Sequence, residues 1–292
     1  MLVIAPRDLA LLVLINLIWG FNLIASKIGV GEFPPLLFTA IRFAIVGLLL
    51  LPFLRFRRGQ MGPLVVAAVM SGALHFGLLF TGLAMSESMS SVAIAGQLGV
   101  PFTTLMSIVF LGEVVRWRRW LGITLAFVGV MVIGLDPLVF RSWPGLALVV
   151  LSAFIGSIGL MAVKKLSGWK PLELQAWFSV ISLPLLIVLS FAFETGQGDA
   201  VRTASWQGWA ALAFTAFVAS LVAHTGYYYL VQRYPVTSVS PLTVLSPVFG
   251  VYFAVTLLGD DLSERMILGA IMTLTGVFIV ALRERKIIET GT

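Results

Sequence analysis

Three ionisable side chains lie inside long apolar runs of the sequence, namely Arg42, His75 and His224. Imidazole titrates nearest to neutral pH, so a histidine there can relay a proton or hold a carboxylate; the alternative is a neutral ring hydrogen-bonded to a neighbouring helix. Both roles stay open for His75, and we favour the packing role for His224. A charge such as Arg42 is costly in an apolar run and marks a candidate binding residue, with pairing to helix-end carbonyls or extension toward an interface as alternatives.

Uncharged polar residues in the same runs complete a set that is suited to holding a small molecule. The candidate substrate-binding residues are Trp19, Asn22, Arg42, His75, Gln97, Thr243 and Ser246. Two prolines, Pro101 and Pro247, lie in the fourth and ninth runs. A proline inside a helix frees a backbone carbonyl and bends the helix. We expect these two bends to act as hinges, curvature for packing alone being the alternative.

Several kinds of chemistry lack the residues that they need. The sequence has no cysteine, and it shows no phosphate-binding glycine loop, metal-ligand spacing or nucleophile constellation. We therefore expect no catalytic residue, no cofactor and no metal. All 13 aspartates and glutamates lie at the ends of the apolar runs or between them. A proton-driven transporter usually holds a carboxylate within the membrane, so this distribution favours facilitated transport unless His75 carries the proton.

The elements that position these residues are predicted to be transmembrane helices. Hydrophobic residues make up 59% of the 292 residues and charged residues only 11%, against about a quarter in soluble domains. Transmembrane strands would alternate polar and apolar residues, which these runs do not. The fold class is therefore all-α integral membrane. Ten apolar runs have spanning length: 9–27, 34–54, 63–83, 90–111, 119–135, 144–164, 172–193, 206–230, 237–258 and 265–282.

Positive charges predict the orientation of these helices. Of the 19 lysines and arginines, 14 fall on the side of the two termini and four on the other, with Arg42 inside the second helix. Basic loops stay in the cytoplasm, so both termini are expected there and the 194–205 loop outside. The net charge of +6 is explained by this rule, and no nucleic-acid partner is expected.

The two halves of the sequence resemble each other. A shift of 147 residues places Gly122 and Gly129 on Gly269 and Gly276, and the letters FLGE on LLGD. Five helices per repeat is an odd number, so the second half must enter the membrane from the opposite side. We expect two inverted five-helix repeats, residues 1–137 and 138–292, as in many secondary transporters. Similarity from apolar composition alone is the alternative.

Several segments also resemble a known family. They are INLIWGFNLIASK in the first helix, FTAIRFAIVGLLLLP in the second, FLGE ending the fourth, LGITLAFVGVMVIG in the fifth and LGAIMTLTGVFIVA in the tenth. The chain resembles the drug/metabolite transporter superfamily of the EamA type over its whole length, and within it bacterial aromatic amino-acid exporters. The resemblance implies a bacterial inner-membrane exporter of amino acids and other metabolites. One departure is that the second-half counterpart of Trp19 is Gly156.

These observations lead to one expectation with three alternatives. We expect an exporter or facilitator of small organic metabolites, aromatic amino acids first, that works by alternating access. Its cavity is expected between the halves, lined by helices 1, 3, 4, 6, 8 and 9, and its partners are a small-molecule substrate and the lipid bilayer, with the chain as a monomer. The alternatives are a drug or nucleotide-sugar transporter, a membrane-embedded lipid-modifying enzyme, and a receptor or scaffold.

Overall fold

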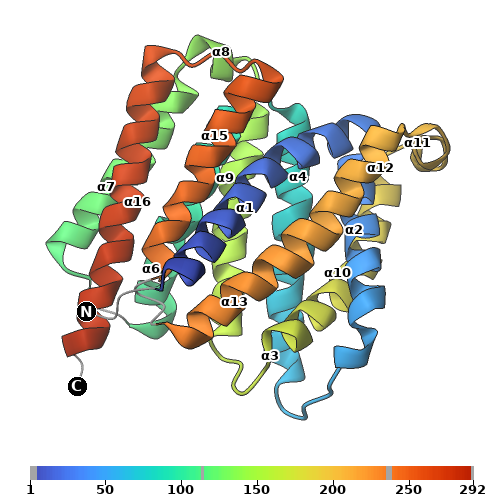
Figure 1. Ribbon diagram of the computed structural model, residues 1–292, viewed down its shortest axis with the longest axis horizontal. Coiled ribbons are helices and arrows are strands. Elements are labelled where there is room, and N and C mark those ends of the chain that lie inside the picture. Colours follow the sequence, from blue (N-terminus) through green and yellow to red (C-terminus); the bar gives the residue numbers. More distant parts are fainter. Residues whose placement is uncertain (1–4, 113–114, 235–238, 291–292) are drawn as a thin grey trace.

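A computed structural model describes residues 5–112, 115–234 and 239–290, and these residues form helices and connections without a strand (Figure 1). The first half contains α1 (Pro6–Glu32), α2 (Pro35–Leu50) with η1 (Leu51–Phe53), α3 (Met61–Ala67), η2 (Ala68–Leu74), α4 (His75–Met85), α5 (Met89–Ala95), η3 (Gly96–Leu98), α6 (Gly99–Leu111) and α7 (Trp117–Gly134).

The second half follows the short connecting helix α8 (Pro137–Phe140). It contains α9 (Trp143–Val163), α10 (Pro171–Phe193), α11 (Gln197–Thr203), α12 (Trp206–Ala213), η4 (Phe214–Ala223), α13 (His224–Arg233), η5 (Ser240–Val244), α15 (Leu245–Leu258) and α16 (Glu264–Thr290). In Figure 1, α1 runs obliquely between α15 on one side and α12–α13 on the other, and it contacts all three helices.

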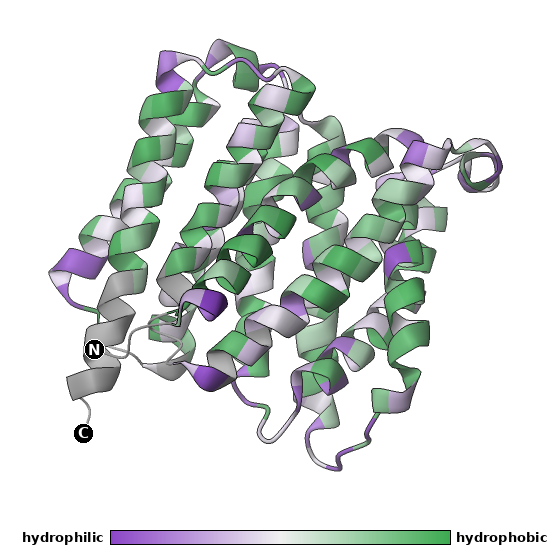
Figure 2. Cartoon of the chain, viewed as in Figure 1, coloured by the Kyte–Doolittle hydropathy of each residue, from purple (hydrophilic) through white to green (hydrophobic). Residues whose placement is uncertain are grey.

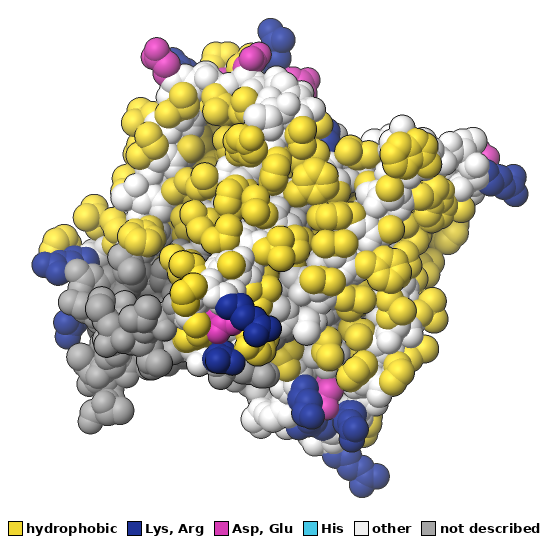
Figure 3. Space-filling view, in the orientation of Figure 1, with side chains coloured by type: hydrophobic (Ala, Val, Ile, Leu, Met, Phe, Trp, Pro, Cys, Tyr) yellow, Lys and Arg dark blue, Asp and Glu magenta, His cyan; other side chains and the backbone are white. Residues whose placement is uncertain are grey.

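The described residues have the length and surface of a membrane-spanning bundle. Nine of their helical stretches are long and apolar enough to cross a membrane, and a further apolar helix, Leu242–Leu258, is shorter. The predicted ninth run begins at residue 237, and residues 235–238 lie outside the described part. Apolar residues follow the helices and polar ones gather at their ends (Figure 2), and on the face in Figure 3 the charged side chains lie mainly near the two ends. The chain is an all-helical integral membrane protein.

Two differences from the predicted elements have local causes. The 194–205 segment, predicted as a polar loop, contains α11. Gly196 adopts a φ of +76° just before this helix, and Asp199 and Arg202 lie near its N- and C-terminal ends, where their charges complement the helix dipole. The first helix was predicted over 9–27 but covers Pro6–Glu32, because Pro6 suits the first turn of a helix and the chain becomes extended only at Phe33, the residue before Pro34.

The glycine pairs of the fifth and tenth predicted helices lie at the contact between α7 and α16. A β-carbon at Gly129 would lie 2.6 Å from the carbonyl oxygen of Gly269, and one at Gly122 would lie 2.8 Å from that of Gly276. Both distances are too short for a side chain, so the absence of one lets the two backbones approach. The four glycines therefore permit the close packing of α7 on α16.

Irregular turns interrupt four of the membrane-spanning elements. The 3₁₀ turns η3 and η5 precede α6 and α15, and Pro101 and Pro247 are each the third residue of the helix that follows. Two π-helical segments, η2 and η4, end at His75 and His224. The shift of 147 residues places 68–74 on 215–221, inside η4. Wide π turns of this kind are frequent at functional sites.

Candidate functional site

Two cavities meet inside the bundle. The central cavity, of about 250 Å³, lies between α1, α4, α5–η3 and α9, and the vestibule, of about 580 Å³, lies between η2, η3–α6, α7 and α9. Both are lined by His75, Phe76, Gly96, Gln97 and Ala153, so they share one wall. The vestibule extends to the C-terminal end of α9 and the first turn of α7, toward the end of the bundle where α1 begins and α16 ends (Figure 1).

Three buried polar atoms of α1 belong to residues of the central cavity and have no hydrogen-bond partner among the described residues. They are Trp19 Nε1, Asn22 Oδ1 and Ser26 Oγ. The three residues are spaced by three and four positions, so they share one face of the helix. An unpaired buried polar atom costs free energy, and natural proteins keep few of them. These atoms therefore indicate a site whose ligand would supply the missing hydrogen bonds.

His75 is fixed at the shared wall by α9. Its Nδ1 atom lies 2.8 Å from the carbonyl oxygen of Ser152, and because a carbonyl can only accept, Nδ1 donates its hydrogen. The Nε2 atom of the neutral ring is then an acceptor. A β-carbon at Gly156 would lie 2.9 Å from His75 Nδ1. Gly156 is the counterpart of Trp19 in the second half, and no indole would fit at this close approach of α4 and α9.

Arg42 lies behind the central cavity rather than in its lining. Its side chain is 4% exposed, which excludes extension toward an interface. Its Nε and Nη2 atoms donate to Ser220 Oγ at 3.2 and 2.9 Å, and Nη1 has no partner among the described residues. The guanidinium carbon lies 4.7 Å from the centroid of the Phe76 ring and 5.6 Å from that of Phe80. Arg42 thus supports the aromatic wall by cation–π contact.

The other predicted residues fall into two groups. The central cavity brings together Trp19, Asn22, His75 and Gln97. The second group, Thr243, Ser246, Pro101 and Pro247, lies around the junctions of η3 with α6 and of η5 with α15, outside the lining of these two cavities. Their roles in binding and as hinges stay predictions.

Among the residues that the structure describes, those that line the two cavities come from the first, third, fourth, fifth and sixth predicted helices, and the contribution of helices 8 and 9 stays a prediction. Side chains of the eighth helix pack against Trp19, with ring centroids at 5.3 Å for His224 and 5.4 Å for Tyr227. The Nδ1 atom of His224 bonds the carbonyl oxygen of Ala219 at 2.7 Å, within its own helix rather than to a neighbouring one, and the role of His224 stays a prediction.

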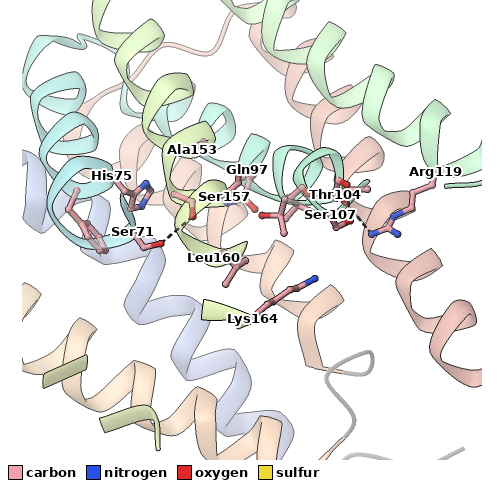
Figure 4. A pocket seen from close by; sticks show the side chains of 16 residues that line it. Ser71, His75, Gln97, Thr104, Ser107, Arg119, Ala153, Ser157, Leu160 and Lys164 are labelled. Atoms are coloured by element: carbon pink, nitrogen blue, oxygen red, sulfur yellow. Dashed lines mark hydrogen bonds between the residues drawn. The ribbon is translucent and has the colours of Figure 1, made fainter. Parts of the chain in front are cut away.

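Three residues of the site were not among the predicted ones. Ser26 follows Asn22 by four residues, so helical spacing alone points to it. Phe76 carries no signal beyond its apolar run. Arg119 counted only as one of the basic residues near the termini, yet it is 4% exposed and lines the vestibule. Figure 4 shows Arg119 bonded to Thr104 at one end of this pocket, with His75 at the other.

Comparisons with known proteins agree with a membrane transporter. The sequence matches the EamA-like transporter family over residues 8–135 and again over 143–282. A relative named "Probable amino-acid metabolite efflux pump" in Escherichia coli (strain K12) is 26% identical over 297 residues, covering 98% of this chain and 99% of the relative. A protein of the same name in Salmonella typhimurium is 26% identical over 284 residues, with 94% of each chain covered.

A third relative carries a location in its name. The "Uncharacterized inner membrane transporter YedA" of Escherichia coli (strain K12) is 25% identical over 263 residues, covering 88% of this chain and 85% of the relative. One crystal structure of a protein superimposes with a TM-score of 0.64 at 17% identity, covering 96% of this chain and 98% of that chain. At this identity the likeness concerns the fold alone.

Proposed function

The chain belongs to the EamA-like transporter family, and we propose that it exports small organic metabolites, aromatic amino acids first, across the bacterial inner membrane by facilitated alternating access. Two relatives at 26% identity are named as probable amino-acid metabolite efflux pumps, and a third is named an inner membrane transporter. These names support the substrate class and the location.

The central cavity carries the proposal. An amino acid presents an ammonium group, a carboxylate and a side chain. The unpaired Asn22 Oδ1 is an acceptor suited to the ammonium, and the unpaired Trp19 Nε1 is a donor suited to the carboxylate. Phe76 and Phe80, which also line this cavity, offer ring faces and edges to an aromatic side chain. A pocket that is mostly apolar with a few placed polar groups is typical of small-molecule sites.

Alternating access requires two related halves, and contacts between helices support the inverted repeat. The first helix of each predicted half contacts the fourth helix of the other half: α1 contacts α15, and α9 contacts α6. Likewise α4 contacts α9, and α12 contacts α1. Exchanging the two halves converts the α1–α15 contact into the α9–α6 contact, and the α4–α9 contact into the α12–α1 contact. We propose repeats 1–137 and 138–292, with both termini in the cytoplasm and hinges at Pro101 and Pro247.

Polar contacts hold the bundle together at the end opposite the chain termini. The carboxylate of Asp260, after α15, accepts hydrogen bonds from Ser90 N at 2.7 Å and Ser88 Oγ at 3.2 Å at the start of α5. The Nζ atom of Lys27 donates to the carbonyl oxygens of Ser86 at 2.7 Å and Leu83 at 3.1 Å. The contacts of Asp260 join the two halves on that side, and those of Lys27 join α1 to the end of α4 within the first half. Both sets of contacts support a state that opens toward the termini.

Counterflow in liposomes tests the proposal. The purified chain is reconstituted, the vesicles are preloaded with unlabelled amino acid, and uptake of labelled phenylalanine, tryptophan, alanine and glutamate is followed with and without a pH gradient. We expect counterflow of the aromatic amino acids and no accumulation driven by the gradient. If only drug cations or nucleotide sugars show counterflow, the substrate belongs to that alternative class and the assignment to amino acids is wrong.

A further inference from the structure

The vestibule contains a buried cation that the central cavity does not use. Arg119 lies in the first turn of α7, and its side chain reaches toward Thr104 and Ser107 of α6 (Figure 4). Its Nη2 atom donates to Thr104 Oγ1 at 3.1 Å, and its Nε atom is buried with no partner among the described residues. A guanidinium has five N–H donors, so a single neutral hydroxyl leaves most of its hydrogen-bonding capacity unused.

The described partner of Arg119 is uncharged. Among the residues that the structure describes, those that line the vestibule beside Arg119 include no aspartate or glutamate. Arg57, a more exposed arginine, shows the usual arrangement, because its Nη2 atom lies 2.8 Å from the carboxylate of Glu173. A buried charge is costly unless it is paired. Within the part of the chain that the structure describes, Arg119 therefore has no anionic partner.

We infer that Arg119 binds the carboxylate of the substrate in the vestibule, before the substrate passes to the central cavity. This inference rests on the proposed transport of amino acids and adds a second, separate contact for the carboxylate. Arginine is suited to the task, because its planar fork matches a carboxylate and it stays protonated. From Arg119 the path leads to His75 and Gln97, which line both cavities. The vestibule thus selects solutes that carry a carboxylate.

The test compares ligands that differ in the carboxylate. Equilibrium binding of phenylalanine, phenylacetate and phenylalaninamide is measured for the full chain in vesicles of phosphatidylcholine alone. Arg119→Gln should weaken binding of phenylalanine and phenylacetate about ten-fold or more, as expected for loss of a hydrogen bond to a charged group, and leave that of phenylalaninamide within about two-fold. Arg119→Lys keeps the charge and should give a smaller loss. Arg118→Gln, at the exposed neighbouring position, is the matched control and should bind as the wild type does.

Each result decides between the two proposals. Equal losses for all three ligands, or no loss for the carboxylates, would overturn the role of Arg119 while leaving amino-acid transport intact. Binding of phenylacetate but not phenylalanine by the wild type, with the loss in Arg119→Gln, would reject amino acids and keep the carboxylate site. A loss that appears only when anionic lipid is added to the vesicles would assign Arg119 to a lipid headgroup and overturn the inference. Retained binding of phenylalaninamide shows that a variant is folded.

Discussion

The Nδ1 atom of His75 lies 2.8 Å from the backbone carbonyl oxygen of Ser152, and this contact joins α4 to α9 at the wall that the central cavity shares with the vestibule. The hydrogen bond occupies the Nδ1 donor of the neutral ring and leaves Nε2 as an acceptor. His75 is therefore oriented by the backbone of α9, and the backbone can approach because residue 156 is a glycine. A substrate that moves between the two cavities passes this ring.

His75→Gln should change affinity without abolishing transport. Glutamine can still form hydrogen bonds, but it does not keep the ring against α9, so we expect the loss of about one net hydrogen bond, a few-fold to roughly ten-fold in the counterflow KM. His224→Gln is a comparison that should change the KM less, because His224 bonds a carbonyl of its own helix and reaches the central cavity only through its contact with Trp19. Accumulation of substrate under a pH gradient by the wild type, lost only in His75→Gln, would contradict facilitated transport.

Trp19→Ala should reduce transport of aromatic solutes more than that of small aliphatic ones. The indole belongs to the lining of the central cavity, and an aromatic contact contributes about 0.5–1.5 kcal/mol, or roughly two- to ten-fold in affinity. The measurement is the ratio of counterflow KM values for phenylalanine and alanine. Trp206→Ala, at an exposed tryptophan in α12, should leave the ratio unchanged. Equal losses for both solutes in Trp19→Ala would assign Trp19 to packing.

Gly129→Ala should destabilise the contact of α7 with α16. The added β-carbon would lie 2.6 Å from the Gly269 carbonyl oxygen and would also clash with Thr273 Oγ1, so one backbone must move. Overpacking of this kind costs about 1–3 kcal/mol. Thermal unfolding in detergent should show a lower midpoint for Gly129→Ala, whereas Gly31→Ala, with no atom within 4 Å of the new β-carbon, should keep or raise it. An unchanged midpoint for Gly129→Ala would show that the two helices separate without cost.

The sequence predicts the parts of this fold that depend on composition along one helix. Apolar runs predict the membrane-spanning helices. The matching glycines of the fifth and tenth runs are visible in the sequence, but only the structure shows that α7 and α16 meet at them. Trp19 and Asn22 share a face with Ser26, so the polar face of α1 follows from spacing. The place of Arg119 does not, because it depends on how α6, α7 and α9 meet. A basic residue next to a predicted helix end is counted as a loop charge until tertiary contacts bury it.

The positions of helices 8 and 9 around α1 could not be predicted for a similar reason. Hydropathy indicates that α12–α13 and α15 lie in the membrane, but not which face of α1 each of them covers. In the structure, His224 and Tyr227 pack on the ring of Trp19, and Phe214 and Phe253 pack on that of Phe21. Aromatic contacts of this kind form between side chains far apart in sequence, so no periodicity within one helix predicts them.

The orientation of the chain is tested by reporters fused at two positions. Gly198 lies in α11, and a β-carbon there would have no atom within 4 Å, so an insertion at this position should be tolerated. Figure 1 shows α11 at the end of the bundle opposite the start of α1 and the end of α16. Because basic residues collect on the side of the termini, α11 should face the periplasm. A phosphatase that is active only in the periplasm should be active at Gly198 and inactive at the C-terminus.

A fluorescent protein that matures only in the cytoplasm provides the matched control for this prediction. It should fluoresce at the C-terminus and stay dark at Gly198, the reverse of the phosphatase. The same orientation decides to which side of the membrane the vestibule opens, since Arg119 and Lys164 lie toward the end of the bundle that carries the termini. Cytoplasmic termini then let substrate reach Arg119 from inside the cell, as export requires. Phosphatase activity at the C-terminus, with fluorescence at Gly198, would turn the vestibule toward the periplasm and contradict an inward opening.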